Sequence, residues 1–316
     1  MKASLSPAAQ HRVTSFNPWI RNGTTIESGA FNSVTIRSCH SSTCSRKMSM
    51  AKPHVAHRNK LLRESLERAK TERHHLQDAL TLASDLLTLG KVSRNNAMDA
   101  INIFKLGRVP AKCIEVINAL NQVGMATHHH YRAAISICKK GSKWKEALTL
   151  FEEMGRHGME RDNITYTDII SACEKSGQWA RALALFEEMG HKGIDRDVIT
   201  YNATISACEK GGQWERAQAL FDEMELLGLK RTTVTYSAMI SACDKAGQWQ
   251  HALRLFAEMR ARGVAQNTVT YGAVIAACGR GGQWQRALAL LEEMPARGVE
   301  RNTIVYSAAM SACVRG

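Results

Sequence analysis

Apolar residues recur at helical spacing twice within each stretch of 35 residues. In the stretch that begins at Asn163, they follow the i, i+3, i+4, i+7 spacing of one helix face. The first series is Tyr166, Ile169, Ile170 and Cys173, and the second is Trp179, Ala182, Leu183, Phe186 and Met189. Between the two series, Ser176 and Gly177 break the pattern, and glycine permits a tight turn. The pattern therefore predicts a helical hairpin.

The hairpin pattern is repeated at a fixed period. The Tyr, Cys and Trp of the first stretch return 35 residues later as Tyr201, Cys208 and Trp214, and then twice more. A period of this length is typical of stacked arrays, in which each unit buries its apolar face against its neighbours. We expect an all-α, right-handed superhelical solenoid of 35-residue helix-turn-helix repeats. Its units are expected to start at Ser93, His128, Asn163, Val198, Thr233, Thr268 and Thr303.

The two end units depart from the pattern. The unit from Ser93 is degenerate, and the unit from Thr303 stops at Gly316 after one helix. The missing helix would cover the apolar face of the one that precedes it, which suggests a truncated chain. The array is thus expected over 93–316, and the apolar stripe within 58–92 predicts an N-terminal helical cap or degenerate unit.

Residues 1–57 are rich in Ser, Thr and Arg and have no sustained apolar period. They include no long apolar core of a secretory signal. This composition fits the transit segment of a chloroplast or mitochondrial protein, with the chloroplast preferred. The alternative is an unfolded basic tail that is never cleaved.

Composition excludes several classes of function. The net charge is +13, but residues 1–58 hold eight bases and one acid, so most of the excess lies outside the repeats. No run of about 18 apolar residues could span a membrane. The acids recur as surface pairs such as Glu187 and Glu188, which is typical of a scaffold and not of one active site. Without a phosphate loop, a nucleophile elbow or a spaced metal-ligand set, we expect no enzyme, cofactor, metal or small-molecule substrate.

Six of the nine cysteines follow the repeat, from Cys138 to Cys313. Equivalent atoms of stacked helices lie about 8–10 Å apart, too far for a disulfide. We interpret these cysteines, like each Tyr and Trp, as packing residues. Reduced thiols suit an organelle interior or the cytosol.

A cation stands at the same position near the end of the first helix of every unit, two residues after the Cys in the six units that have one. These cations are Lys105, Lys140, Lys175, Lys210, Lys245, Arg280 and Arg315. Stacking would place them in a row suited to the phosphates of a polyanion. The alternative is the preference of a helix C-terminus for cations, worth about 0.3–1 kcal/mol.

Two other positions vary among small or polar residues. The residue after each Tyr, expected to face outward, is Arg132, Thr167, Asn202, Ser237, Gly272 or Ser307. The last residue of each unit is Asp162, Asp197, Thr232, Asn267 or Asn302. A constant scaffold with hydrogen-bonding residues at chosen positions is what modular base recognition requires. The alternative is drift of a tolerant surface.

The chain resembles the pentatricopeptide repeat (PPR) family. The resemblance rests on the 35-residue length, the V/I-T-Y opening, the S-A-C-x-K/R-x-G stretch and the A-L-x-L-F-x-E-M second helix, and it covers roughly 93–316. Arginines stand where the family often has proline, at Arg161, Arg196, Arg231 and Arg301. Tetratricopeptide repeats are the nearest competitor, but their period is 34. A scaffold that binds peptides or proteins is therefore the alternative function.

The resemblance implies sequence-selective binding of single-stranded RNA, one base per repeat. The two variable residues of a unit would select the base, and an aliphatic residue would sandwich it. The aliphatic residues are Ile164, Ile199, Val234, Val269 and Ile304. The pairs and implied bases are Thr167 with Asp197 for guanine, Asn202 with Thr232 for a pyrimidine, Ser237 with Asn267 for adenine, and Gly272 with Asn302 leaning to adenine. Arg132 with Asp162 implies no base, and a partner protein would supply catalysis in organellar RNA processing.

Overall fold

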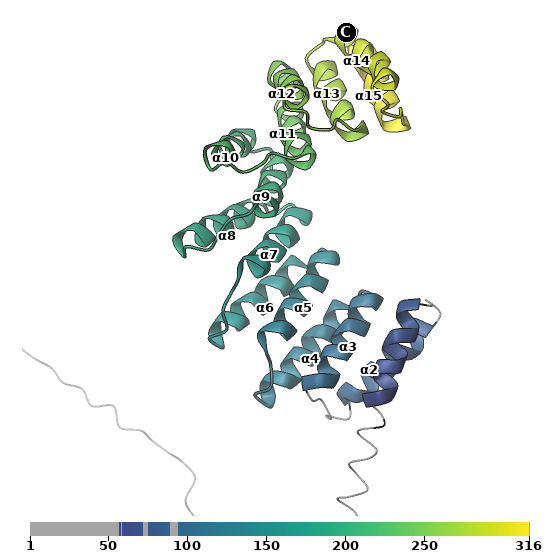
Figure 1. Ribbon diagram of the computed structural model, residues 1–316, viewed down its shortest axis with the longest axis vertical. Coiled ribbons are helices and arrows are strands. Elements are labelled where there is room, and N and C mark those ends of the chain that lie inside the picture. Colours follow the sequence, from purple (N-terminus) through teal and green to yellow (C-terminus); the bar gives the residue numbers. More distant parts are fainter. Residues whose placement is uncertain (1–56, 58, 72–74, 89–93, 316) are drawn as a thin grey trace, which may run out of the picture. The chain divides into compact units, whose positions relative to one another are not determined.

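The computed structural model describes residues 57, 59–71, 75–88 and 94–315. The leader expected over 1–57 lies outside these residues except for His57, and so does part of the cap expected over 58–92. Every regular element of the described chain is a helix (Figure 1). The fold class is therefore all-α, as the sequence predicts.

The helices form pairs that follow one another along the chain. A helix over 59–71 comes first, and α2, Leu76–Thr88, packs against α3 and α4. The further helices are α3 Arg94–Gly107, α4 Pro110–Gln122, α5 His128–Lys140, α6 Trp144–Arg156, α7 Asn163–Lys175, α8 Trp179–His191, α9 Val198–Lys210, α10 Trp214–Leu226, α11 Thr233–Lys245, α12 Trp249–Ala261, α13 Thr268–Arg280, α14 Trp284–Ala296 and α15 Thr303–Arg315.

The first helix of each repeat packs on the first helix of the next. Thus α7 contacts α5 and α9 as well as its own partner α8, and the same arrangement continues through α11, α13 and α15 (Figure 1). This packing is the helical-repeat stacking that the 35-residue period predicts. It places equivalent positions of successive first helices side by side.

Helix boundaries follow from capping and turn residues. Asp162 and Asp197 precede α7 and α9, and each side chain accepts a hydrogen bond from the backbone N–H three residues on, at 2.9 and 2.8 Å. The turn that separates α7 from α8 contains Gly177 with φ +69°, a conformation that favours glycine. The sequence therefore sets both ends of the hairpin.

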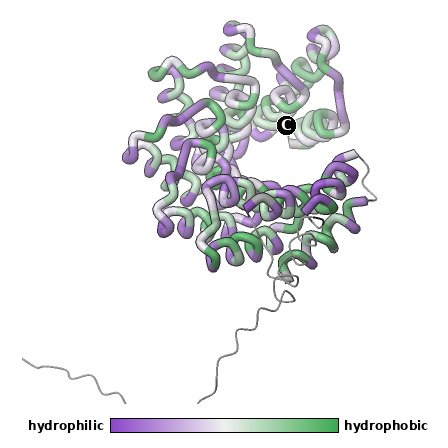
Figure 2. Tube along the Cα trace, turned by 60° about the horizontal axis from the view of Figure 1, so that its bottom comes forward, coloured by the Kyte–Doolittle hydropathy of each residue, from purple (hydrophilic) through white to green (hydrophobic). Residues whose placement is uncertain are grey.

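Tyrosines and cysteines of the repeat form the core. Tyr166 and Tyr201 are fully buried, and each lies edge-on to a phenylalanine of the preceding second helix, with Phe151 4.8 Å and Phe186 4.9 Å from the ring. Burial raises the pKa of the Cys138 thiol to about 12. Hydrophobic and hydrophilic stretches alternate along the helices (Figure 2). The packing role predicted for the tyrosines and cysteines is confirmed for those of α5, α7, α9, α11 and α13, whereas Tyr306 of α15 is 44% exposed.

Cys313 does not follow that prediction, whereas Trp144, Trp179, Trp214 and Trp249 pack against the core at its edge. Cys313 is exposed, because it lies on α15, onto which no later helix of the described chain packs. Trp144 and Trp179 are only partly buried. An arginine from the next repeat covers each ring, with the guanidinium carbon of Arg181 4.5 Å from Trp144 and that of Arg216 5.3 Å from Trp179. The tryptophans therefore join repeats at the surface of the array.

Candidate nucleic-acid interface

Large aliphatic side chains lie exposed at the second position of successive first helices. They are the residues predicted to sandwich bases, and their exposed fractions are 52% for Ile164, 65% for Ile199, 58% for Val234, 65% for Val269 and 72% for Ile304. Most other apolar positions of α7, α9, α11 and α13 are buried, and the rest, such as Val198 and Ala203, are half-buried. Single exposed aliphatics need no explanation. A row at one position in five stacked helices, which we call the aliphatic row, indicates a contact surface.

The residues that follow each tyrosine lie at the junction between repeats and do not simply face outward. Thr167 is only 8% exposed, and its hydroxyl lies 2.7 Å from that of Thr200 on α9. The expectation of an outward-facing position is wrong for Thr167, because the turn of α7 that carries it packs against the next repeat. Four of the other residues at this position are half-buried, namely Arg132, Asn202, Ser237 and Gly272. Ser307 is exposed.

The last residue of each unit is the N-cap of the next first helix. Besides the two aspartates, Thr232 caps α11 and Asn267 caps α13, and Asn302 accepts a hydrogen bond from the Val305 N–H at 3.0 Å. Asp, Asn and Thr are preferred N-caps. The polar set at this position therefore has a structural cause that is independent of any ligand.

Predicted base-selecting pairs are brought together by the fold. The Asn202 amide donates to the Thr232 hydroxyl at 3.5 Å, and a guanidinium nitrogen of Arg132 lies 3.5 Å from an Asp162 carboxylate oxygen. Although burial alone would raise the pKa of Asp162, hydrogen bonds from Thr165 and the charges of Arg132 and His128 hold it below its usual value. The two members of each pair thus lie next to each other in the folded chain.

The other pairs are linked less directly. Thr167 and Asp197 each contact the hydroxyl of Thr200, at 2.7 Å in both cases. Ser237 and Asn267 line one cavity. Among the residues that the structure describes, no hydrogen bond or ion pair joins Gly272 to Asn302, which is expected because Gly272 has no side chain.

Two cavities lie at equivalent positions, three repeats apart. One, of about 320 Å³, is lined by the pair Ser237 and Asn267 and by Val234 and Val269 of the aliphatic row. The other, of about 300 Å³, is lined by the equivalents of three of these residues, which are His129, Arg132 and Ile164. A selecting pair and two aliphatic side chains thus surround one hollow in the repeat from Thr233. A larger cavity of about 590 Å³ lies at the C-terminal ends of α6 and α8 and touches no predicted site residue.

Five of the predicted phosphate-binding cations, Lys140, Lys175, Lys210, Lys245 and Arg280, are exposed at the ends of the first helices, but three of them are paired with carboxylates. Lys210 lies 2.5 Å from Glu174 of the preceding repeat. The two pairs that follow are Lys245 with Glu209 at 2.7 Å and Arg280 with Asp244 at 3.0 Å. We call these the inter-repeat ion pairs. Their carboxylates are only 10–16% exposed.

Lys140 and Lys175 differ from these three cations. Among the described residues, no carboxylate lies within 4.0 Å of either one. In the inter-repeat ion pairs, the acid stands just before the cation of the preceding unit. The residue at that place is Phe104 for Lys140 and Lys139 for Lys175, so neither cation has an acid to pair with there. Lys139 itself pairs with Asp168 at 2.5 Å. Lys140 and Lys175 are therefore available to a ligand, whereas Lys210, Lys245 and Arg280 are neutralised.

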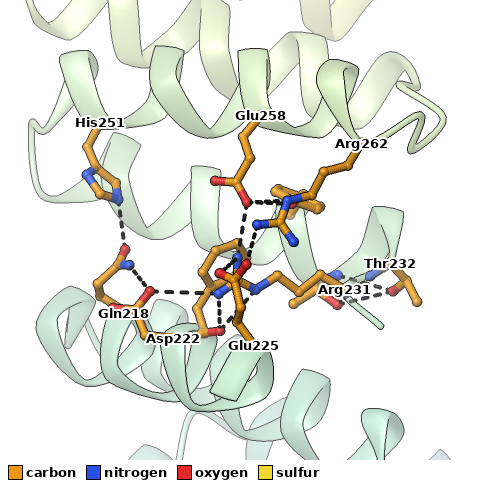
Figure 3. A network of polar contacts seen from close by, with 11 residues as sticks. Gln218, Asp222, Glu225, Arg231, Thr232, His251, Glu258 and Arg262 are labelled. Atoms are coloured by element: carbon orange, nitrogen blue, oxygen red, sulfur yellow. Dashed lines mark hydrogen bonds and ion pairs between the residues drawn. The ribbon is translucent and has the colours of Figure 1, made fainter. Parts of the chain in front are cut away.

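Sequence reasoning missed a second set of contacts between repeats. The guanidinium carbon of Arg231 lies 3.8 Å above the Phe221 ring, and its nitrogens contact Glu258 of the next repeat at 3.1 Å and Glu225 at 2.8 Å (Figure 3). Glu258 also accepts a hydrogen bond from Tyr236 at 2.9 Å.

Arg161 and Arg196 stack on Phe151 and Phe186 in the same way, each at 4.2 Å. Arg161 and Arg196 also lie 3.9 and 3.4 Å from Glu188 and Glu223 of the next repeat, so they join successive repeats, whereas Arg301 contacts carbonyls of its own repeat. The recurrence of these arginines at 35 residues was the signal that could have identified them.

Other kinds of site find no support in the described part of the chain. No group of three or more His, Cys, Asp and Glu residues there could hold a metal ion. None of the helices described is both long and apolar enough to cross a membrane.

Comparison with known families gives a consistent result. The model of the PPR repeat family matches residues 161–209, 196–245, 231–280 and 266–315, and that of the PPR repeat matches 129–159. No curated protein matches the chain.

Several solved structures share the fold. Maize PPR10 is 23% identical with a TM-score of 0.51, over 81% of this chain and 41% of PPR10. PPR10 in complex with an 18-nt psaJ RNA element gives a TM-score of 0.57 at 23% identity, over 84% of this chain and 38% of PPR10. The PPR domain of Arabidopsis thaliana protein-only RNase P 1 in complex with tRNA is 15% identical with a TM-score of 0.50, over 57% of this chain and 95% of that domain. The chain thus spans about two fifths of PPR10.

Proposed function

Because the chain belongs to the PPR repeat family, we propose that it binds single-stranded RNA sequence-selectively, with one base held by each complete repeat. The observation that carries this proposal is the aliphatic row beside the selecting pairs. In the cavity of about 320 Å³, Val234 and Val269 lie beside Ser237 and Asn267. A base offers two flat apolar faces and a polar edge, and this lining offers a complement to both.

The family resemblance also supplies the expected bases. With units running from the 5′ to the 3′ end, the repeats from Asn163 to Thr268 would prefer guanine, a pyrimidine, adenine and adenine. Three or four bases are too few to specify one transcript, so a partner protein or further repeats would complete the recognition. The partner would also supply any catalysis.

The cellular role that fits such binding is occupation of a site on an organellar transcript. Occupation would direct processing, protect the transcript or help its translation. The basic composition of residues 1–57 supports import into a chloroplast or a mitochondrion. PPR10, a structure of similar fold, was crystallised with an 18-nt psaJ RNA element.

Selection from a random pool of single-stranded RNA tests the proposal. The full chain should enrich RNAs that contain guanine, a pyrimidine and adenine in this order. Replacing Val234 and Val269 by alanine should abolish the enrichment at the repeat from Thr233. Leu226→Ala is the matched control, since Leu226 is 87% exposed but lies on the second helix α10.

The opposite outcome of this selection would favour the alternative function. A chain that enriches no RNA, and instead retains one peptide or protein from an organelle extract, would replace this proposal by a protein-interaction scaffold.

A further inference from the structure

The cavity beside Arg132 differs in charge from its equivalent three repeats further along. Its lining includes Lys105, His129 and Arg132. At the equivalent positions, the cavity beside Ser237 has Val234 in place of His129 and Ser237 in place of Arg132. The lining of that second cavity includes Glu209 and no lysine or arginine. Two hollows of similar size on one scaffold are therefore suited to different ligand groups.

The acids near Arg132 do not cancel its charge and that of Lys105. Asp168 also lines the cavity, but its carboxylate is already paired with Lys139 at 2.5 Å. Asp162 lies 3.5 Å from Arg132, a long contact that leaves other guanidinium donors available. Within the described chain, Lys105 has no carboxylate within 4.0 Å. The cavity thus keeps a surplus of positive charge.

These side chains suit a phosphate group better than a base. A guanidinium presents paired N–H donors that match two phosphate oxygens, and an ammonium adds a compact charge. A base sandwich would need an aliphatic side chain on both sides, whereas His129 occupies one of the two positions. We propose that the cavity lined by Lys105, His129 and Arg132 binds a phosphate group of the RNA and selects no base.

This inference rests on the proposed RNA binding and adds a direction to it. Further along the array, Lys210, Lys245 and Arg280 are held in the inter-repeat ion pairs. The phosphate site and the unpaired Lys140 and Lys175 lie on the N-terminal side of these pairs. The RNA backbone is therefore anchored at the N-terminal end of the array, and bases are selected beyond it.

The test measures RNA affinity against salt concentration for the full chain and the double variant Lys105→Gln, Arg132→Ser. The serine reproduces Ser237 of the neutral cavity. Loss of this one phosphate site should reduce the magnitude of the slope of log K against log salt by about 0.7, because each phosphate contacted on a single strand contributes about 0.7. Lysine at position 132 in place of the serine (Arg132→Lys) should restore part of the salt dependence. Lys210→Gln removes a cation that is already paired, so it should leave the wild-type slope unchanged. Circular dichroism shows whether each variant is folded.

Two sources of the phosphate are distinguished by the RNA used. If a terminal phosphate is bound, RNA with a 5′- or 3′-monophosphate will bind the wild type more tightly than the hydroxyl form, and the double variant will lose this difference. If an internal phosphodiester is bound, the double variant will bind the phosphorylated and the hydroxyl forms of the RNA more weakly than the wild type does, by the same factor.

An unchanged slope in the double variant would overturn the phosphate site while leaving RNA binding intact. So would a loss confined to RNAs with one particular base, because Arg132 would then select that base. A wild-type chain that binds no RNA would overturn the proposed function itself.

Discussion

The ammonium of Lys210 on α9 lies 2.5 Å from the carboxylate of Glu174 on α7, so a predicted phosphate-binding cation is neutralised by the preceding repeat. Glu174 is only 16% exposed, which limits screening by solvent. The same relationship recurs at Lys245 and Arg280. Charge along the array is thus set by residues of two neighbouring repeats together.

Removing the acids should strengthen RNA binding. In the variant Glu174→Gln, Glu209→Gln, the side chains of Lys210 and Lys245 are released to contact phosphates. We expect tighter binding at low salt, and a slope of log K against log salt that is steeper by up to about 1.4, or about 0.7 per added contact. Fluorescence anisotropy over a salt series measures both. Glu187→Gln, an exposed acid on α8, is the control and should change little; equal effects of both variants would mean that only net charge matters.

Substitution of Asn202 should change the base preferred by its repeat. Its amide oxygen accepts a hydrogen bond from Thr235 at 2.6 Å while its nitrogen donates to Thr232. A serine is too short to keep both contacts. We expect Asn202→Ser to shift the preference from a pyrimidine towards a purine, by about 1 kcal/mol or roughly fivefold in relative affinity.

Random-pool selection measures the shift. The adjacent repeat, with Ser237, is an internal control because its preference should not move. A shift at both repeats, or at neither, would contradict the assignment of Asn202.

The helices were predictable because each depends on residues within one repeat. Tyr166 to Cys173 and Trp179 to Met189 mark α7 and α8 by spacing alone. The partial exposure of Trp144 was not predictable from spacing, because it depends on Arg181 from the next repeat. The burial of Thr167 likewise depends on Thr200.

Within the site, the sequence predicted which positions matter but not their partners. The aliphatic row was expected and lies exposed at one position of each first helix. The inter-repeat ion pairs join residues 36 apart, such as Glu174 and Lys210, and only stacking brings such residues together. Without the stacked structure, Glu174 is an ordinary surface acid.

Replacing Arg231 should destabilise the array. Its side chain is only 3% exposed and binds two glutamates and the Phe221 carbonyl. Gln266 occupies the same position one repeat later and keeps the carbonyl contact, to Phe256 at 3.2 Å, with one neutral hydrogen bond from the Tyr271 hydroxyl at 3.5 Å. Arg231→Gln should therefore lose the charged contacts and cost about 1.5–3 kcal/mol of unfolding free energy.

Urea unfolding followed by circular dichroism measures the cost. Arg262→Gln is the matched control, since Arg262 contacts Glu225 and Glu258 too but is 44% exposed. Its loss should cost about 0–1 kcal/mol. Equal losses of unfolding free energy in both variants would mean that the burial of Arg231 does not strengthen its ion pairs.

Stability should fall as the pH is lowered from 7.5 to 5.5. Burial, together with the charges of His129 and Arg94, lowers the pKa of His130 below 6.5, although a hydrogen bond to the Arg94 carbonyl opposes this. Its Nδ1 accepts the Thr127 N–H at 3.1 Å, so protonation would break the cap of α5. The folded chain thus binds fewer protons than the unfolded chain, and stability present above pH 6.5 is lost below it.

The midpoint of urea unfolding at pH 7.5, 6.5 and 5.5 measures this loss. His130→Gln should flatten the pH dependence. Part of it should remain, because burial also lowers the pKa of His251. An unchanged dependence in His130→Gln would exclude His130 as its source.

Each unit ends on a residue that also starts the next helix, as Asp197 does for α9 and Asn267 for α13. An apolar replacement there would cost about 0.5–2 kcal/mol of helix stability. Exchanges among Asp, Asn, Ser and Thr avoid that cost while presenting a different hydrogen-bonding group beside the aliphatic row. Under the proposed function, such a chain would acquire a new RNA target by single substitutions, one repeat at a time, and each variant along the way would keep its helix caps and its fold.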